Sequence, residues 1–378
     1  MIDKPNVLIF IDWFYPAFKA GGPIKSVFNM AEALKEEYAF HIVTSNLDED
    51  GSVLDVIFNQ WTEFSGFPVI YLNAEKQKNK NFKKLLDEVR PVVIYYNSLF
   101  SKNFTLIPYL LFKKESIIQL IAPRGMLGKG ALAIKPLKKS LFLQFAKCFI
   151  FSQSKTYWHA TSEQEAKEIK AALGTKTKIK IAQNLSSPIV RREHLIKEIG
   201  ELKLVFISRL ALKKNLLFAL ELMQKLQNEM DISLDIYGPI EEENYWEKCK
   251  AIIEKDNRIH YKGILAPHEI TPTLQQYHFY ILPTLHENYG HSIVEAIVCG
   301  VPVIISKNTP WLNINQNGIG ADLPLDELNQ WELYLRKIIE LSQAEYDQMV
   351  KNCLEFSKHN IVDKRHRIAA IDLFKFNS

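Results

Sequence analysis

The sequence has little cysteine, and its four cysteines are spread too widely to define a site. Cys148, Cys249, Cys299 and Cys353 form no C-x-x-C pair and have no cluster of histidines beside them. This spacing excludes a disulfide framework and a zinc site of the usual kinds. We expect the thiols to be reduced and mostly buried.

The chain also lacks long apolar runs and the common cofactor fingerprints. No apolar run approaches the ~20 residues that a membrane-spanning helix needs, and no signal-peptide pattern begins the chain, so we expect a cytoplasmic protein. No G-x-G-x-x-G follows the first apolar run, which disfavours NAD, and there is no Walker sequence. No Asp-x-Asp stands where it could hold a metal ion.

What is present is an ordinary globular mixture. The 378 residues are 47% hydrophobic and 24% charged, which suits two domains of usual size. The net charge of +4 is uneven, with 25 Lys and Arg against 17 Asp and Glu over residues 1–190, and 22 against 26 in the rest. This modest basic excess lacks an aromatic stacking platform, which argues against binding of nucleic acid.

Strand-like and helix-like segments alternate in both halves. Val7 to Ile11 reads as a strand, and after a loop the apolar residues of Ile24 to Leu34 recur at helical spacing. The second half opens in the same way, with a strand at Leu202 to Ser208. The alternation predicts an α/β fold with two doubly wound, Rossmann-like sheets.

The stretch from Tyr280 to Ser306 is the most informative part of the chain. It reads as the end of a buried strand, a polar loop, a short helix over Ile293 to Cys299 that Gly300 ends, and a further strand. A helix that begins just after a strand's carboxyl end offers unpaired N–H groups and a positive dipole end to an anion. We therefore predict a nucleotide or phosphate site here.

Two carboxylates frame this turn, Glu287 in the loop and Glu295 in the helix. With Gly290 between them, the loop can bend so that both acids face one ligand and accept hydrogen bonds from sugar hydroxyls. The alternative for Glu295 is a capping box, because Ser292 stands three residues before it. The alternative for Glu287 is an ordinary solvated loop acid.

Arg209 and Lys214 straddle the strand-to-helix turn that opens the second half. Such a pair can converge on a diphosphate, with arginine as a planar fork and lysine as a point charge. Surface turns carry many such pairs, so the spacing alone is weak evidence.

The residues together resemble a known family. The pattern Glu-x7-Glu followed by Ala296, Gly300, Pro302 and Val303 looks like the signature of retaining, nucleotide-sugar-dependent glycosyltransferases of GT-B fold, family 4. Two further segments, Thr309-Pro310-Trp311 and Pro123-Arg124-Gly125-Met126, are similar to a branch that acts in bacterial capsule, O-antigen and other polysaccharide biosynthesis. The resemblance covers nearly the whole chain and is strongest from Leu202 to Gly320.

The resemblance implies roles for individual residues. It assigns Arg209 and Lys214 to the donor's leaving diphosphate, Glu287 to the hydroxyls of the donor sugar and Glu295 to the ribose. It implies catalytic roles for Arg209, Lys214 and Glu287. The implied donor-binding residues are Gly21, Gly22, Gly263, Leu265, Asn288, Tyr289, Gly290, His291, Ser292 and Glu295, and the implied acceptor-side residues are Asn97 and Arg124.

The sequence departs from the family pattern at three places. Asn215 stands where glycine is usual, Gln183 replaces a proline, and the loop at Asn97 lacks a histidine that many relatives carry. Because of these departures, a nucleotide-sugar-binding protein without transfer activity is an alternative interpretation. A second alternative is a GT-B nucleotide-sugar epimerase or hydrolase.

The resemblance implies a domain division and a reaction. We expect an acceptor-side domain over residues 1–190, a donor domain over 191–355 with a linker at 185–201, and a segment 356–378 that crosses back to the first domain. The implied reaction moves a sugar, with retained configuration, from a UDP- or GDP-sugar to a hydroxyl of a growing glycan, without metal or cofactor.

The acceptor that we expect is a lipid-linked oligosaccharide. Lys129, Lys135, Lys138 and Lys139 lie in an amphipathic stretch of the basic half, which suits an anionic membrane surface or a phosphate-bearing lipid. The hypothesis is therefore a peripheral contact with the inner face of the cytoplasmic membrane. The alternative is a solvated helix face over an ordinary core.

Overall fold

The computed structural model describes residues 4–128, 132, 136–146, 150–151, 155–226 and 231–376. Lys129, Lys135 and Cys148 lie outside these residues, and of Lys138 only the backbone is described. The chain divides into two compact units, residues 1–185 with 364–378, and residues 186–363. None of the helices within the described ranges is long and apolar enough to cross a membrane.

The first unit is built on an eight-stranded sheet. Its order is β3-β4-β2-β1-β5-β6-β7-β8, and every neighbouring pair is parallel except β3 with β4. The strands are β1 (Asn6–Phe10), β2 (Ala39–Ser45), β3 (Trp61–Phe64), β4 (Phe67–Leu72), β5 (Val93–Tyr96), β6 (Ile118–Ile121), β7 (Thr156–Ala160) and β8 (Ile179–Ile181).

Helices cover both faces of this sheet because its strands are apolar on both sides. Val7 and Ile9 of β1 join one core cluster and Leu8 and Phe10 join the other, as the alternation of side chains along a strand requires. The first face carries α1 (Gly22–Leu34) and α13 (Lys364–Leu373), and the second carries α2 (Asn79–Val89), α3 (Ile107–Phe112), α5 (Pro136–Phe145) and α6 (Glu163–Leu173). A π-helical turn, η1 (Lys102–Leu106), precedes α3.

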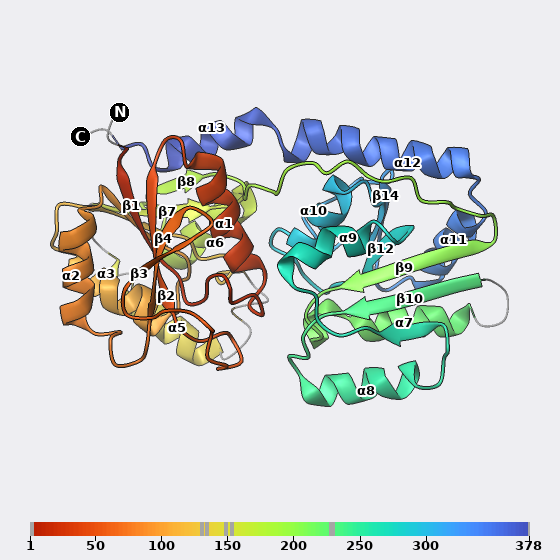
Figure 1. The fold of residues 1–378 in the computed structure, drawn as a ribbon, viewed down its shortest axis with the longest axis horizontal. Helices are drawn as coiled ribbons and strands as arrows, with labels where there is room; N and C mark the ends of the chain where they lie inside the picture. The colour runs from red at the N-terminus through yellow and green to blue at the C-terminus, as the bar shows by residue number, and fades with distance from the viewer. Residues whose placement is uncertain are drawn as a thin grey trace. The chain divides into compact units, whose positions relative to one another are not determined.

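The second unit has a six-stranded, fully parallel sheet in the order β11-β10-β9-β12-β13-β14. Its strands are β9 (Glu201–Ile207), β10 (Asp231–Tyr237), β11 (Ile259–Tyr261), β12 (Phe279–Leu282), β13 (Val303–Ser306) and β14 (Gly320–Leu323). The helices are α7 (Leu216–Lys225), α8 (Glu243–Ile253), α9 (Ile270–Leu274), α10 (His291–Val298), α11 (Leu328–Ile339) and α12 (Gln343–Phe356), with single turns η3 (Leu212–Lys214), η4 (Pro267–Glu269) and η5 (Ser357–Ile361). Figure 1 labels most of these elements.

Both sheets have the doubly wound order that the sequence predicts. In each sheet the first strand in the chain lies in the interior, and the later strands are added on one side and then on the other. The direction of winding reverses between β1 and β5 in the first sheet and between β9 and β12 in the second. The α/β prediction with two Rossmann-like sheets is confirmed, and such reversal points are where ligands of these folds bind.

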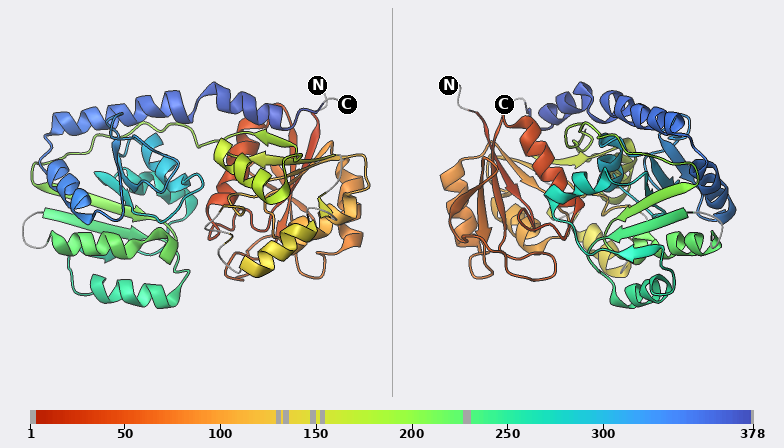
Figure 2. Two further views of the ribbon diagram at one scale, coloured as in Figure 1. Left: turned by 180° about the vertical axis from the view of Figure 1, so that it is seen from behind. Right: turned by 45° about the vertical axis from the view of Figure 1, so that its right-hand side comes forward.

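The end of the chain belongs to the first unit. Helix α13 lies beside α1 in Figures 1 and 2, and Tyr38 Oη donates to the Ile371 carbonyl over 3.1 Å. The Arg367 guanidinium lies 2.6 Å from a Glu37 carboxylate oxygen. The return begins at Lys364, whereas residues 357–361 still belong to the second unit.

The segment 185–201, predicted to be a linker, is for the most part folded onto the second unit. Arg192 is buried and donates to the Tyr277 carbonyl and the Tyr346 hydroxyl over 2.7 and 2.6 Å. The buried Lys197 ammonium donates to the Ile339 carbonyl over 2.9 Å. Charged residues normally indicate solvent, but here carbonyls distant in the sequence accept hydrogen bonds from Arg192 Nη2 and from the Lys197 ammonium.

Candidate functional site

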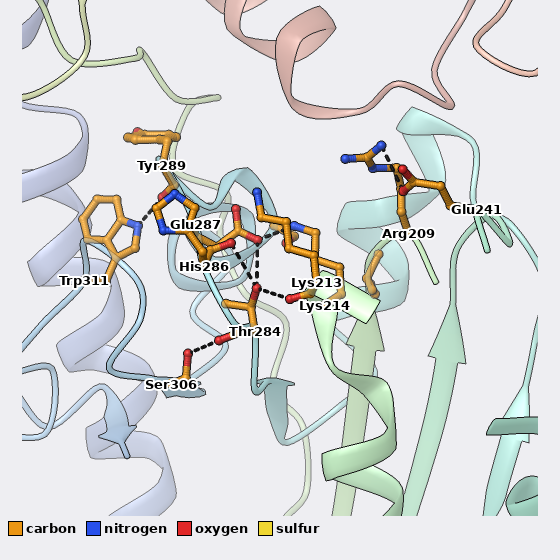
Figure 3. Close-up of polar contacts among 12 residues, drawn as sticks. Arg209, Lys213, Lys214, Glu241, Thr284, His286, Glu287, Tyr289, Ser306 and Trp311 are labelled. Carbon is orange, nitrogen blue, oxygen red and sulfur yellow. Dashed lines mark hydrogen bonds and ion pairs between the residues drawn. The ribbon is translucent and has the colours of Figure 1, made fainter. Parts of the chain in front are cut away.

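The candidate site of the second unit lies where its winding reverses. Strands β9 and β12 are neighbours in this sheet, and their carboxyl ends run into the turn 208–215 and the loop 283–290. The first segment carries Arg209 and Lys214, and the second carries Glu287. The sheet therefore brings together three of the side chains that the sequence singled out (Figure 3).

Backbone and hydroxyl hydrogen bonds hold the two segments side by side. Leu285 N–H and Thr284 Oγ1 both donate to the Lys213 carbonyl, over 2.8 and 3.0 Å. Thr284 is fully buried, and its own carbonyl accepts from Ser306 Oγ at the end of β13 over 2.5 Å. These contacts fix the loop against the turn before any charged group is considered.

Lys214 and Glu287 form an ion pair across the two segments. The Lys214 ammonium donates to Glu287 Oε1, and the side chains are only 14% and 10% exposed. The loop backbone supports this arrangement because Glu287 N–H donates to the Asn308 carbonyl over 3.1 Å. Glu287 is therefore not an ordinary solvated loop acid, which was the alternative interpretation.

Arg209 is held by a carboxylate that the sequence analysis did not single out. Its guanidinium lies 3.0 Å from Glu241 Oε2, and both side chains are partly exposed (Figure 3). Glu241 follows β10, and Leu210 forms a parallel bridge with Ile240, so the backbone aligns the two residues. Both predicted diphosphate cations are thus already paired with an acid.

Lys213 adds a third cation to the cluster. It extends from the same turn as Lys214 toward Glu287 (Figure 3). Desolvation lowers the pKa of the Lys213 ammonium, and the cations Lys214 and Arg209 lower it further, whereas Glu287 acts in the opposite sense. Because burial disfavours the charged form of Lys213, this ammonium gains from a bound anion.

The departure at Asn215 has a conformational reason. Asn215 ends η3 and begins α7 with φ 58° and ψ 43°, which is the left-handed region. Asparagine enters this region more readily than other residues except glycine. The replacement of the family's usual glycine therefore keeps the backbone turn that carries Lys214.

Helix α10 presents its amino terminus at the end of the loop. Gly290 is the N-cap with φ 77°, and a Cβ built there would lie 2.8 Å from Ile293 Cδ1, so glycine is required. The N–H groups of His291, Ser292 and Ile293 precede the first intrahelical bond, which Val294 donates to Gly290. These N–H groups can donate hydrogen bonds to the oxygens of a phosphate.

The capping box at Ser292 and Glu295, which was the alternative interpretation of Glu295, is not formed, because Gly290 is the N-cap of α10. Ser292 lies inside the helix, and its hydroxyl pairs with Tyr280 Oη over 2.8 Å. Burial raises the pKa of Tyr280, and the negative charges of Glu287 and Glu295 raise it further. Both acids therefore act electrostatically on one buried hydroxyl.

The rest of the loop is braced by aromatic rings. Trp311 Nε1 donates to the Tyr289 carbonyl over 2.5 Å, and the two rings meet edge to face at 5.7 Å. The Tyr289 ring also lies 4.9 Å from that of His291. Asn288, the neighbour of Tyr289, completes the loop. The packing orients the backbone that leads into α10.

Gly263 and Leu265 lie in the loop that follows β11, at the edge of the second sheet. Gly238 N–H, at the end of β10, donates to the Gly263 carbonyl over 2.8 Å, and Gly263 has φ 90°. The loop is therefore fixed against the carboxyl end of β10, beside the strand that leads to Arg209.

The remaining predicted residues belong to the first unit. Gly21 is the N-cap of α1 with φ 69°, and Gly22 begins the helix. The Arg124 guanidinium donates to Asn97 Oδ1 over 2.6 Å, to Asn184 Oδ1 over 2.5 Å and to Tyr95 Oη over 2.8 Å. Asn97 also donates to the Pro23 carbonyl, so Arg124 and Asn97 tie the ends of β5 and β6 to the start of α1.

His159 extends this network and has a structural environment. Its ring is buried between Tyr95 Oη and the Ala182 carbonyl, each 2.8 Å away. Burial and the Arg124 charge lower the pKa of His159 to about 3. The ring is therefore neutral at physiological pH.

Sequence reasoning missed Lys213, Glu241 and Thr284 as members of the site. Lys213 could have been found from its position beside Lys214, but nothing local marks Glu241 or Thr284. Within the ranges that the structure describes, no group of three or more His, Cys, Asp or Glu side chains could hold a metal ion.

Residues 188–356, nearly the whole second unit, match the family described as Glycosyl transferases group 1. The second unit therefore carries a glycosyl transferases group 1 domain. This domain contains Arg209, Lys214, Glu287, Glu295 and the loop between the two acids.

One curated relative matches part of this chain. The UDP-N-acetylglucosamine–peptide N-acetylglucosaminyltransferase GtfA subunit of Limosilactobacillus reuteri subsp. suis is 31% identical over 196 residues, which make up 50% of this chain and 36% of that protein. The match thus spans little more than a third of that relative's length.

Solved structures match over nearly the whole chain. A sucrose-phosphate synthase from Thermosynechococcus elongatus has a TM-score of 0.76 at 15% identity and covers 98% of both chains. Anabaena HepE in complex with UDP and glucose has a TM-score of 0.69 at 13% identity, covering 97% of this chain and 98% of that one. These likenesses confirm the predicted GT-B fold.

Proposed function

We propose that this chain is a retaining glycosyltransferase that transfers a sugar from a nucleoside-diphosphate sugar to a glycan hydroxyl. The observation that carries the proposal is the position of two acid-paired cations, Lys214 beside Glu287 and Arg209 beside Glu241, at the winding reversal of the group 1 domain. Cations at that point suit a diphosphate, and a carboxylate beside them suits sugar hydroxyls.

The leaving nucleoside diphosphate gains negative charge as the glycosidic bond breaks. Arg209, Lys214 and the amino terminus of α10 can neutralise this charge, so the proposal needs no metal ion or cofactor. The donor's phosphates would replace Glu241 at Arg209 and Glu287 at Lys214. Glu287 is then released to orient the donor sugar.

The remaining donor contacts follow the same arrangement. Glu295, whose charge lies near that of Glu287 around Tyr280, would bind the ribose hydroxyls. The backbone of Gly263 and Leu265 would lie beside the base, and residues 288–292 would surround the phosphates.

We propose same-face attack for the transfer step. The acceptor oxygen bonds to the anomeric carbon on the face from which the diphosphate leaves, and a phosphate oxygen takes the acceptor's proton. Glu287 is then not a nucleophile, unlike the second carboxylate of a retaining glycoside hydrolase. A trapped covalent adduct of the sugar on Glu287 would contradict this step.

The donor is proposed to be a UDP- or GDP-sugar, and the acceptor a lipid-linked oligosaccharide for a surface polysaccharide. The names of the L. reuteri relative and of the HepE structure both include UDP, which favours the uridine nucleotide. The acceptor proposal rests on the basic excess of residues 1–190 and places the protein at the inner face of the cytoplasmic membrane.

A thermal-shift screen tests the donor site. UDP, GDP, ADP and CMP are each added with and without magnesium to the wild-type chain, Arg209→Ala and the control Arg191→Ala, whose side chain is exposed in the same unit. One nucleoside diphosphate should raise the melting temperature without magnesium, and only Arg209→Ala should lose the effect. No response to any nucleotide would reject the donor-site assignment.

Product analysis separates transfer from the two alternatives. The wild-type chain is incubated with the responding nucleotide's sugars, with and without a glycan acceptor. A glycosylated product that forms only with acceptor supports transfer. Free sugar or an epimerised donor identifies the hydrolase or epimerase, and binding without turnover identifies the binding protein.

A further inference from the structure

A cavity of about 450 Å³ opens in the first unit at the carboxyl ends of its strands. Its lining includes Asp12 and Trp13 after β1, Asp48 after β2, Gln77 after β4, and Ser101 and Asn103 after β5. We call it the Asp12 pocket. It lies at the winding reversal between β1 and β5, and its volume is that of a small-molecule site.

The uncharged polar lining is held in place by hydrogen bonds. Asn103 Nδ2 donates to Gln77 Oε1 over 2.7 Å, and Gln77 Nε2 donates to the Leu72 carbonyl over 2.9 Å. Ser101 caps the π-helical turn η1 by accepting from Phe104 N–H over 3.0 Å. The polar groups are thus fixed on strand ends and a helical turn, which favours specific recognition.

Asp12 supplies a carboxylate with acceptor capacity toward the pocket. Ser101 Oγ donates to Asp12 Oδ1 over 2.5 Å, which uses one of the about four acceptor positions of a carboxylate. Burial raises the pKa of Asp12. Because burial removes part of the hydration of this carboxylate, a hydroxyl group of a ligand would supply a hydrogen bond in place of water.

The charge of the lining is negative, although the unit as a whole is basic. Asp48 is 4% exposed and accepts from Phe18 N–H and Glu49 N–H over 3.2 and 2.7 Å. Asp12, Asp48 and Glu49 thus face the pocket together with a single lysine, Lys102. A phosphate placed here would meet like charge.

Trp13 and the buried Phe104 supply the aromatic part of the pocket lining, and Trp13 is partly buried beside the core of the first unit. The apolar face of a sugar ring can cover such an indole, while the ring's hydroxyls reach the carboxylate and amide groups. A ligand that fits this lining has hydroxyl donors, an apolar face that can cover the indole and no negative charge. A neutral sugar residue has these three properties.

We infer that the Asp12 pocket binds a neutral, hydroxyl-rich sugar residue of the acceptor glycan and discriminates against phosphorylated or carboxylated sugars. The inference rests on the proposed transferase function, whose acceptor it specifies. It assigns recognition of the glycan to Asp12 and Trp13, whereas the polar groups of Asn97 and Arg124 bind one another and neighbouring strands. Any lipid phosphate of the acceptor would then lie outside this pocket.

Binding of simple sugars tests the inference on the full chain. The probes are methyl glucoside, methyl galactoside and N-acetylglucosamine, with glucose 6-phosphate and glucuronic acid as anionic counterparts. Binding is followed by tryptophan fluorescence and by saturation-transfer NMR of the sugar. At least one neutral sugar should bind saturably, and its anionic counterpart should bind at least about tenfold more weakly.

Two variants and one control assign the binding to this pocket. Asp12→Asn should weaken binding of the neutral sugar by about tenfold, because a charge-assisted hydrogen bond is lost. Trp13→Phe should remove the fluorescence change while the NMR signal persists in weakened form. Asp87→Asn, at an exposed acid of α2, should bind sugar as the wild-type chain does.

The outcomes separate this inference from the donor proposal. Asp12→Asn should keep the full nucleotide-induced thermal shift, because Asp12 lies outside the group 1 domain. Tighter binding of the anionic sugars, unchanged binding by Asp12→Asn, or no binding of any neutral sugar while the nucleotide shift persists would overturn the inference. Loss of the nucleotide shift in the wild-type chain would instead reject the donor site.

Discussion

Lys214 and Glu287 lie 73 residues apart in the sequence, yet the ammonium of one donates to the carboxylate of the other. Their contact joins the turn after β9 to the loop after β12, at the point where the winding of the second sheet reverses. The pair joins these two segments with the same charges that the proposed donor would engage. The proposed function therefore couples stability and donor binding through these two side chains.

This coupling predicts a non-additive double mutant. Lys214→Met or Glu287→Gln alone leaves a poorly solvated charge without its partner, whereas the double variant removes both charges. We expect the double variant to be more stable than the sum of the single effects predicts, by ~1–3 kcal/mol. Urea titration of all four chains measures the free energies of unfolding.

The exposed pair Lys84 and Glu88 on α2 is the matched control. Its nitrogen-to-oxygen distance is 3.3 Å, but its side chains are 75% and 39% exposed. Solvent screening should limit its coupling to about 0.5 kcal/mol or less. Equal coupling energies for the two pairs would show that burial of Lys214 and Glu287 has no energetic effect.

Lys213 should act as a third diphosphate-binding cation. Lys213→Gln should weaken binding of the responding nucleotide by about tenfold, because one charge-assisted contact is lost. The exposed Lys248→Gln on α8 should bind as the wild-type chain does. Isothermal titration calorimetry compares the three chains, and an unchanged affinity for Lys213→Gln would remove this residue from the site.

The lowered pKa of Lys213 also predicts a pH dependence. A bound diphosphate favours the ammonium form, so the nucleotide complex must take up a proton when the free chain has lost it. Affinity should therefore fall as pH rises through the lowered pKa, and less steeply in Lys213→Gln. Titrations in two buffers with different ionisation enthalpies measure the proton uptake.

The sequence predicted those features that depend on local patterns. Apolar periodicity located strands β1 and β9 and the helix α1, which was predicted over Ile24 to Leu34 and spans Gly22–Leu34. The spacing of Arg209 and Lys214 and the loop at Glu287 could also be recognised in the sequence, because each lies within a short segment that directly follows one strand. The parallel sheet then brings these stretches together.

Features that depend on distant partners were not predictable. Strand β3 is short, pairs antiparallel at the edge of the sheet and lacks a clear alternation, so it was missed. The charged residues Arg192 and Lys197 suggested a solvated linker. Their burial was not predictable, because the carbonyls that accept their hydrogen bonds belong to the distant residues Tyr277 and Ile339. The spacing of Ser292 and Glu295 matched a capping box, but Gly290 is the N-cap of α10. The Ser292 hydroxyl pairs instead with Tyr280 Oη.

Asn215 shows how a departure from a family pattern can be neutral. Because Asn215 has φ 58°, Asn215→Gly should keep stability within about 0.5 kcal/mol and keep nucleotide binding. Asn215→Val should cost ~1–2 kcal/mol, since a β-branched residue is strained in the left-handed region. Asn244→Val, at an exposed position of α8, is the control, because asparagine and valine have similar helix propensities.

Urea unfolding and the nucleotide-induced thermal shift measure both effects. Preserved stability but lost nucleotide binding in Asn215→Gly would mean that the asparagine side chain itself contributes to the site. Equal stability of the valine and glycine variants would contradict the conformational explanation.

His159 should make the first unit sensitive to acid. Its pKa is about 3 in the folded chain, against 6.5 as the ordinary value, because burial and Arg124 disfavour the charged ring. A depressed folded pKa means that the unfolded chain takes up the proton first. The stability from the neutral ring is therefore fully present above pH 6.5 and is lost as pH falls from there toward 3.

The loss attributable to His159 should reach about 1.4 kcal/mol one pH unit below the ordinary pKa, since one pKa unit corresponds to that free energy. Urea titrations at several pH values should give a steeper decline for the wild-type chain than for His159→Gln. The variant loses the contacts to Tyr95 and Ala182 and should be less stable near neutral pH, but its stability should depend less on acid. His268→Gln, at an exposed position of η4, should keep the wild-type slope. Parallel curves for the wild-type chain and His159→Gln would mean that the ring binds protons equally in the folded and unfolded chains, and the network of Arg124, Tyr95 and His159 would then need a different arrangement of protons.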